Sequence, residues 1–401
     1  MPDAAIFRAT VEAALRSLPA HLDPFDRTRR ALNRLELSGT VAVVAFGKAS
    51  RAMAAAANEV FGSRIVAGVL VAPDDEALDR FEVHVGSHPL PDAASETAGR
   101  AALRLAERSD HGHLIALVSG GGSAMVEVPK RPLDIAQLTD LTNRLLQAGT
   151  PIDELNVVRR HLSDIKNGGL SGRSKVPVTT LVISDVIDGP PSMVASGPTL
   201  RDTSDALTAL AIIERRLGRP VPPRIHTALA TPVAHRPNET AVVVADRHTA
   251  YAVVAHQLAK AGFQPAQPAR LEGDAATMAR TLSTQEGLTI GTGETTVVVT
   301  GDGTGGRNQH GALAAAITIA GTDAVFASFG TDGVDGPTDA AGAVVDGTTA
   351  GAIRVAGIDP DVSLANCDSH PVLDAVGALI RTGPTGTNVA DVWVTYVPAT
   401  R

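Results

Sequence analysis

The segment from Gly293 to Ala316, GETTVVVTGDGTGGRNQHGALAAA, contains the pattern that decides the fold. Residues 295–300 are β-branched and apolar, which is typical of a buried parallel strand. A loop with four glycines and Asp302 follows at 301–306, and from Arg307 onward Ala and Leu indicate a helix. A glycine loop between a strand and a helix directs backbone N–H groups at an anion.

Charged and polar neighbours strengthen this interpretation of the loop. The planar fork of Arg307 suits phosphate or carboxylate. Asn308 follows it, and Glu294 stands just before the expected strand. A glycine loop alone would indicate only a tight turn, but this combination favours an anion site. We therefore predict that Gly303 and Gly305, with Glu294 and Asn308, contribute to binding phosphate or substrate.

Composition limits the class of protein. A chain of 401 residues with 44% hydrophobic and 19% charged residues can bury large cores in two or three domains. The net charge of -8 argues against nucleic acid or an anionic membrane as a partner. One cysteine excludes an intrachain disulfide and fits a reducing compartment. Without a leader or an apolar run near ~18 residues, we expect a cytoplasmic protein with no membrane span.

A lysine follows the first expected strand. Residues 40–46, TVAVVAF, read as a buried strand, and a helix is expected from Ser50. Lys48 would then lie at the carboxyl end of a strand, where open α/β sheets bind ligands. A surface lysine is the alternative, but a basic residue at a helix start opposes the helix dipole. We predict a site role for Lys48. His88 in SHPLPD is a further candidate for the same crevice, although a loop histidine holding its own turn is more common.

A second glycine loop follows the expected strand at 114–118. Its residues are Ser119, Gly120, Gly121, Gly122 and Ser123. Backbone and hydroxyl donors can converge there on an anion. The loop lacks the Lys-Ser/Thr of a P-loop and the GxSxG of a serine hydrolase.

Acidic residues follow two other expected strands. Asp185 and Asp188 come after the strand at 178–184, where they can hold Mg²⁺ or accept a hydroxyl proton. The loop after 324–329 carries Asp332, Asp335 and Asp339, which also suggest metal or hydroxyl contacts. Residues 155–172 read as one basic helix with Arg159, Arg160 and Lys166 on a solvated face or at a carbonyl cap.

These observations predict a doubly wound α/β protein. Two glycine loops, several acids and a few cations suit phosphoryl transfer, which needs positioning and charge neutralisation. A dinucleotide enzyme is the alternative use of such a sheet. Its GxGxxG fingerprint should follow the first strand, where the sequence instead reads AFGKASRAM. Residues 301–306 do match GxGxxG, but a lone match is a weak signal.

Together these motifs resemble glycerate 2-kinases, the class II glycerate kinases with a C-terminal MOFRL domain. The matching stretches are FGKAS (46–50), SHPLPD (87–92), VSGGGSA (118–124), LNVVRRHLSDIKNGG (155–169), ISDVIDGPPSMVASGPT (183–199), GETTVVVTGDGTGGRNQ (293–309), GTDGVDGPTDAAGA (330–343) and GPTGTN (383–388). The resemblance implies ATP- and Mg²⁺-dependent phosphorylation of D-glycerate at its 2-hydroxyl. It also implies a larger Rossmann-like domain, a smaller α/β domain and an active site in the cleft between them.

The resemblance assigns site residues as well. The family's lysine, arginine, glutamate and final asparagine fall on Lys48, Arg307, Glu294 and Asn388. The family usually reads Gly-Asp-Asp where this chain has Asp188-Gly189-Pro190, so the role of the displaced aspartate passes to Asp188 or Asp185, or is lost. A second departure is His310, where the family tends to have glutamate.

We expect residues 1–225 to form the N-terminal domain and 226–401 the C-terminal domain, with the MOFRL region at about 290–398. The oligomeric state stays open, with a homodimer as one alternative. Two other functions remain in view: an NAD(P)H-dependent hydroxypyruvate reductase and a non-catalytic protein that binds sugar acids.

Overall fold

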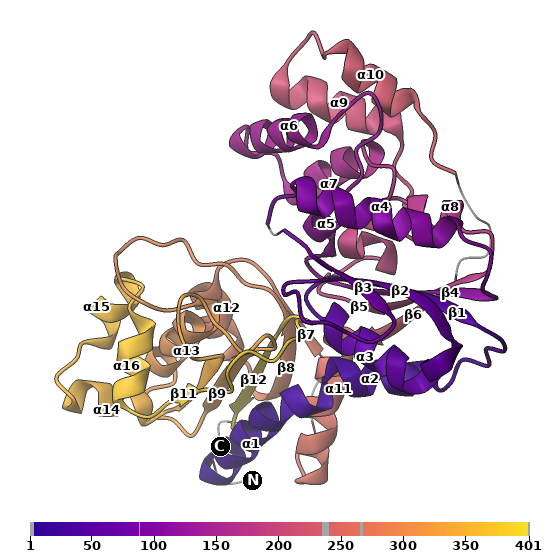
Figure 1. Cartoon of the computed structure of the whole chain (residues 1–401). Helices are drawn as coiled ribbons and strands as arrows, with labels where there is room; N and C mark the ends of the chain where they lie inside the picture. The colour runs from indigo at the N-terminus through magenta and orange to yellow at the C-terminus, as the bar shows by residue number, and fades with distance from the viewer. Residues whose placement is uncertain (1–3, 88, 235–239, 265–267, 400–401) are drawn as a thin grey trace. The chain divides into compact units, whose positions relative to one another are not determined.

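The structure is a computed structural model that describes residues 4–87, 89–234, 240–264 and 268–399 (Figure 1). The chain forms two compact units, which are described separately. The N-terminal unit is Pro24–Val244, and the C-terminal unit combines Met1–Asp23 with Ala245–Arg401.

A six-stranded sheet forms the centre of the N-terminal unit. Its strand order is β3-β2-β1-β4-β5-β6, and the pairings from β3 to β5 are parallel. This is the order of doubly wound dinucleotide-binding sheets, with its switch point between β1 and β4. The strands are β1 (Val41–Phe46), β2 (Ile65–Ala72), β3 (Phe81–Val85), β4 (His113–Ser119), β5 (Val178–Ile183) and β6 (Thr240–Ala245).

Helices cover both faces of this sheet. α2 (Pro24–Leu32) and α3 (Ser50–Phe61) lie on one face, and α4 (Ala93–Glu107) and α8 (Gly169–Arg173) on the other (Figure 1). The inner strands β1, β4 and β5 are almost wholly buried because both faces are covered, which explains their near-continuous apolar sequences, whereas the edge strands β3 and β6 are partly exposed. A further helical layer has its own leucine-rich core and comprises α6 (Ile135–Gln147), α7 (Ile152–His161), α9 (Ala206–Leu217) and α10 (Pro223–Ala230).

The sheet of the C-terminal unit is mixed. Its order is β11-β10-β9-β12-β8-β7, with β7 and β8 parallel and the other pairs antiparallel. The strands are β7 (Pro268–Leu271), β8 (Gly287–Gly293), β9 (Val325–Gly330), β10 (Gly342–Asp346), β11 (Leu379–Ile380) and β12 (Asp391–Val397). α12 (Ala275–Leu282) packs beside α13 (Arg307–Thr318) on one side of this sheet, with α14 (Thr349–Val355), α15 (Pro360–Ala365) and α16 (Ser369–Ala375) around them.

The first helix belongs to the C-terminal unit. α1 (Ala4–His21) packs against β9, β10 and α11 (Arg247–Lys260). The ring of Phe7 lies 4.9 Å from the rings of both Phe263 and Tyr396, and Arg8 pairs with Asp346. The division into compact units therefore differs from the expected boundary at 225/226 in two ways. α1 crosses to the C-terminal unit because its apolar face covers that sheet, and β6 extends the N-terminal sheet to residue 244.

The expected strand at 295–300 is wrong. The strand is β8 (Gly287–Gly293). The residues after Glu294 belong to no strand, although Thr296 forms an isolated bridge with Asp274, and Val298 and Val299 are exposed. β8 contains glycine because Leu271 on β7 lies too close for a side chain. A Cβ on Gly291 would lie 2.6 Å from Leu271 Cδ2. Glu294 therefore follows its strand instead of preceding one.

The expected helix at 155–172 is interrupted. α7 ends at His161 and α8 begins at Gly169. Between them Asn167 and Gly168 have φ of 53° and 78°, a left-handed backbone that a helix cannot contain. The predicted class is nevertheless confirmed: a doubly wound parallel sheet and a second α/β unit. Within the described residues, no helix is both long and apolar enough to cross a membrane.

Candidate active site

The carboxyl ends of β1 and β4 meet at the switch point of the N-terminal sheet. Phe46 and Val118 are register partners, so the loops that follow these residues lie together. The N–H of Lys48 donates to the carbonyl of Gly120 at 2.9 Å, and the N–H of Ala49 donates to Ser119 Oγ at 3.0 Å. The side chain of Lys48 is exposed and forms no ion pair within the described part of the chain.

The approach of these loops leaves no room for added side chains. A Cβ on Gly47, where φ is +114°, would lie 2.4 Å from Ser119 Oγ. A Cβ on Gly120 would lie 2.1 Å from Asp185 Oδ2, so the Asp185 carboxylate rests against the glycine loop. We call this group the switch-point site. It comprises Lys48, Ser119, Gly120, Gly121, Gly122, Ser123 and Asp185.

The two candidate aspartates differ in their exposure and in what they contact. Asp185 lies half-buried at the end of β5, against Gly120, whereas Asp188 is exposed in the following turn. His88, the other candidate near this edge, lies outside the described residues.

A strained loop supports Ser123. Its hydroxyl lies 2.9 Å from Ser196 Oγ. Ala195, Ser196 and Gly197 have φ of 50°, 62° and 65°, which is costly for the first two because they carry a Cβ. Backbone hydrogen bonds hold this conformation, since the N–H of Asn167 donates to the Ser196 carbonyl at 3.1 Å.

The basic residues of 155–172 are buried, so the expected solvated face is wrong. Arg159 Nη2 donates to the carbonyl of Ser123 at 3.0 Å. Lys166 pairs with Glu127, and both side chains are fully buried. Burial lowers the pKa of Lys166 to about 8, against the attraction of Glu127. One feature of the sequence could have predicted this buried pair: Glu127 is a carboxylate inside the apolar run 125–128.

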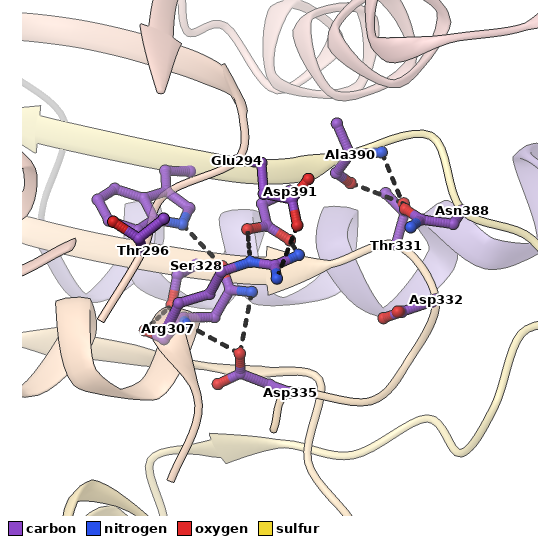
Figure 2. A network of polar contacts seen from close by, with 12 residues as sticks. Glu294, Thr296, Arg307, Ser328, Thr331, Asp332, Asp335, Asn388, Ala390 and Asp391 are labelled. Carbon is purple, nitrogen blue, oxygen red and sulfur yellow. Dashed lines mark hydrogen bonds and ion pairs between the residues drawn. The ribbon is translucent and has the colours of Figure 1, made fainter. Parts of the chain in front are cut away.

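In the C-terminal unit, carboxylates on both sides hold the side chain of Arg307 (Figure 2). Its Nε and Nη2 donate to Asp391 at 2.6 and 3.1 Å, and its Nη1 lies 2.9 Å from Glu294 Oε1. Burial raises the pKa of Asp391 to about 6, even though the hydrogen bonds from Arg307 oppose that shift. For Arg307, burial lowers the pKa, but the hydrogen bonds and charge of Asp391 outweigh burial and raise it above the ordinary value.

Asp335 occupies two backbone donors at the start of α13. The N–H groups of Asn308 and Gln309 donate to its carboxylate at 3.0 and 2.8 Å. Burial raises the pKa of Asp335, against these hydrogen bonds. The Asn308 side chain is buried and accepts a 2.7 Å hydrogen bond from Trp393 Nε1, which links the start of α13 to β12.

The three backbone N–H groups that precede Asn308 remain available to a ligand. Within the described part of the chain, the N–H groups of Gly305, Gly306 and Arg307 donate no hydrogen bond, and all three residues line a pocket of about 670 Å³. We call it the α13 pocket. Gly303, Glu294 and Asp332 also line it, so the structure brings these predicted residues together.

Asn388 lies in the loop before β12. Its Oδ1 accepts from the N–H of Ala390 at 3.1 Å and from Thr331 Oγ1 at 3.4 Å (Figure 2). Asp332 follows Thr331 and accepts from the N–H of Val334 at 3.2 Å. Asn388 therefore stands beside the loop that carries Asp332, outside the lining of the α13 pocket.

The oxygen donors present fit Mg²⁺ held partly by substrate. The described residues contain no group of three or more His, Cys, Asp or Glu side chains arranged to hold a metal. Mg²⁺ commonly takes one or two carboxylates and completes its shell with water and phosphate oxygens. Asp185 lies against a glycine loop, and its carboxylate would be one such ligand.

Comparisons with known proteins agree with this arrangement. A family described as a domain of unknown function matches residues 3–230, and the MOFRL family matches residues 287–391. D-glycerate 2-kinase of Thermotoga maritima is 36% identical over 96% of both chains. The chain belongs to the glycerate 2-kinase family. This confirms the resemblance seen in the sequence motifs.

A solved structure and another relative are also similar to this chain. The crystal structure of Thermotoga maritima glycerate kinase matches with a TM-score of 0.92 at 33% identity, covering 98% of this chain and 100% of that one. A protein of Agrobacterium vitis, provisionally named a hydroxypyruvate reductase, is 36% identical and spans 88% of this chain and 86% of its own. In this glycerate 2-kinase family member, the MOFRL match includes every residue that lines the α13 pocket, Arg307 and Asp335 among them.

Proposed function

We propose that the protein is an ATP-dependent glycerate 2-kinase, which transfers the γ-phosphoryl group of ATP to the 2-hydroxyl of D-glycerate. The products are 2-phosphoglycerate and ADP. One observation carries the proposal: each unit of this family member presents a glycine loop beside a basic residue, Lys48 in one and Arg307 in the other.

Phosphoryl transfer asks the protein for positioning and charge neutralisation, with no covalent nucleophile. Lys48 is the exposed cation at the switch point and would neutralise charge on the transferred group. The Ser119–Ser123 loop would hold the acceptor's carboxylate or a phosphate through backbone N–H groups. Arg307, fixed by Asp391, would supply the second cation.

Asp185 is the better placed of the two candidate acids, because it touches the glycine loop whereas Asp188 is exposed. We propose that Asp185 orients the acceptor hydroxyl or holds Mg²⁺, which when bound would neutralise phosphate charge. Within the C-terminal unit, Asp332 lines the α13 pocket and Asn388 lies beside its loop, and both would contact substrate or Mg²⁺. Glu294 and Asn308 would position Arg307 and α13.

The name of the Agrobacterium relative keeps hydroxypyruvate reductase as the second candidate. Against it, Gly47-Lys48 stands where a dinucleotide sheet carries its GxGxxG loop. Mixing the protein with hydroxypyruvate and NADH or NADPH tests it, because turnover oxidises the cofactor and lowers the absorbance. A sugar-acid-binding protein without activity would instead gain Tm with the acid and form no product from ATP.

Phosphorus NMR of the product tests the kinase directly. With D-glycerate and MgATP, we expect ADP and a phosphomonoester on the 2-hydroxyl. Lys48→Ala should reduce turnover by about 100-fold or more while leaving Tm unchanged, since one electrostatic contact of this kind is worth about 3–4 kcal/mol in the transition state. A Lys48→Ala variant with full activity would refute the assigned role.

A further inference from the structure

The α13 pocket is larger than the chemistry assigned to Arg307 requires. A three-carbon acid occupies only a small part of about 670 Å³. The rest of the lining differs in character from the loop at 303–307. Val297, Val299, Val334, Pro337 and Cys367 give the pocket an apolar wall. An acceptor made only of hydroxyls and a carboxylate has nothing to place against such a wall.

Three buried polar atoms of the lining have no hydrogen-bond partner among the described residues. They are Thr295 Oγ1, Ser369 Oγ and His310 Nδ1. The residues are 1%, 0% and 8% exposed, so these atoms lie buried in the wall of the pocket. An unpaired buried polar atom costs about 1–3 kcal/mol, and a ligand that pairs with it recovers that energy. The pocket therefore suits a ligand with an apolar face and polar edges.

Three carboxylates also line the pocket: Glu294 pairs with Arg307, Asp335 accepts from the N–H groups of Asn308 and Gln309, and Asp332 lies in the neighbouring loop. An anion is favoured at residues 305–307. The unused N–H groups of Gly305, Gly306 and Arg307 lie at the N-terminus of α13, where the helix dipole favours negative charge. A flat apolar ring with polar edges, joined to an anionic tail, is the chemistry of a nucleotide. Aromatic bases bind against aliphatic side chains, and their ring nitrogens and the ribose hydroxyls pair with groups such as Thr295 and Ser369.

We propose that the α13 pocket is the nucleotide-binding site of this protein. The base packs against the wall of Val297, Val299, Val334 and Pro337, and the phosphates accept hydrogen bonds from Gly305, Gly306 and Arg307. The acceptor then binds at the switch-point site. The identity of the nucleotide as ATP and ADP rests on the proposed function, whereas the location of its site rests on the pocket.

Two adjacent valines provide a matched test. Val298 and Val299 are 77% and 71% exposed and follow one another in the segment between β8 and α13, but only Val299 lines the pocket. We expect Val299→Asp to raise the Kd of Mg·ADP, measured by calorimetry, by about tenfold or more, equivalent to about 1.4 kcal/mol. Val298→Asp should change it by less than about twofold, and neither variant should change the KM for glycerate. Equal effects of the two variants on ADP, or an effect of Val299→Asp on glycerate alone, would overturn the proposal.

Cys367 supplies a second readout that needs no variant. It is the chain's single cysteine, is 8% exposed and lines the same pocket. Saturating Mg·ADP should slow its alkylation by iodoacetamide, and D-glycerate should not. Protection by glycerate and not by ADP would place the acceptor in the pocket and refute the proposal. Both ADP measurements are independent of turnover, so a failure to form 2-phosphoglycerate would count against the proposed function alone.

Discussion

The guanidinium of Arg307 is fixed by the carboxylate of Asp391, which lies fully buried at the start of β12. Two hydrogen bonds, of 2.6 and 3.1 Å, use the planar fork of the arginine. The contact joins the first residue of α13 to a central strand. It sets the direction of the Arg307 side chain beside three unused backbone donors.

Replacing Asp391 with Asn should therefore impair turnover through Arg307. The amide keeps the shape of the carboxylate but accepts only one of the two hydrogen bonds and removes the charge. We expect kcat to fall by about 100-fold, because small misplacements of a charge-stabilising group cost that much. Steady-state kinetics with D-glycerate and MgATP measures the loss. Asp374→Asn, which changes an exposed partner of Arg381 in the same unit, should have full activity. Similar losses in both variants would contradict the role of Asp391.

The raised pKa of Asp391 predicts opposite pH trends for activity and stability. The carboxyl has a folded pKa of about 6, above its ordinary value of 3.8. Its contribution to stability is present in full below that ordinary value and is lost as pH rises through 6. The anion that holds Arg307 forms over the same range, so kcat/KM should rise between about pH 5 and 7. Because ATP also titrates in this range, wild type and Asp391→Asn are compared at each pH. The readouts are the ratio of their kcat/KM values and the ratio of their free energies of unfolding in urea. A ratio that is constant across this range would exclude Asp391 as the titrating group.

A methyl group on Gly120 should disturb the switch-point site. Its Cβ would lie 2.1 Å from Asp185 Oδ2, so the carboxylate or the loop must move. We expect Gly120→Ala to lose about 100-fold in kcat/KM. Gly351→Ala is the control, since nothing lies within 4 Å of its added Cβ on α14. That control should leave activity unchanged and stabilise the helix by about 0.5–1 kcal/mol. Full activity of Gly120→Ala would mean that Asp185 does not act from this position.

Breaking the buried Lys166–Glu127 pair should lower the free energy of unfolding of the N-terminal unit. Lys166→Met leaves the Glu127 carboxylate buried without its partner, which costs about 3–5 kcal/mol. Adding Glu127→Leu should restore part of this loss, because the unpaired charge is removed. Arg100→Met, which breaks an exposed pair with Glu96, should cost less than about 1 kcal/mol. Urea unfolding compares the variants, and equal costs for Lys166→Met and Arg100→Met would refute the prediction.

Sequence patterns predicted most strands and the two glycine loops, because buried parallel strands have a local apolar signature. They failed at 295–300, since a β-branched run can line a pocket as well as fill a core. They also missed β8, where glycine provides room for Leu271 on a neighbouring strand. The burial of Arg159 and Lys166 depends on Glu127 and Ser123, which are more than thirty positions away. The periodicity of one segment cannot predict a partner that lies so far away in the sequence.

The position of α1 has a consequence for the order in which the molecule is made. Phe7 and Arg8 leave the ribosome early, but Phe263, Asp346 and Tyr396, which they contact, are synthesised long afterwards. The doubly wound unit, encoded between them, can fold during this interval. The apolar face of α1 must meanwhile wait uncovered, which exposes the nascent chain to aggregation until its last strand emerges.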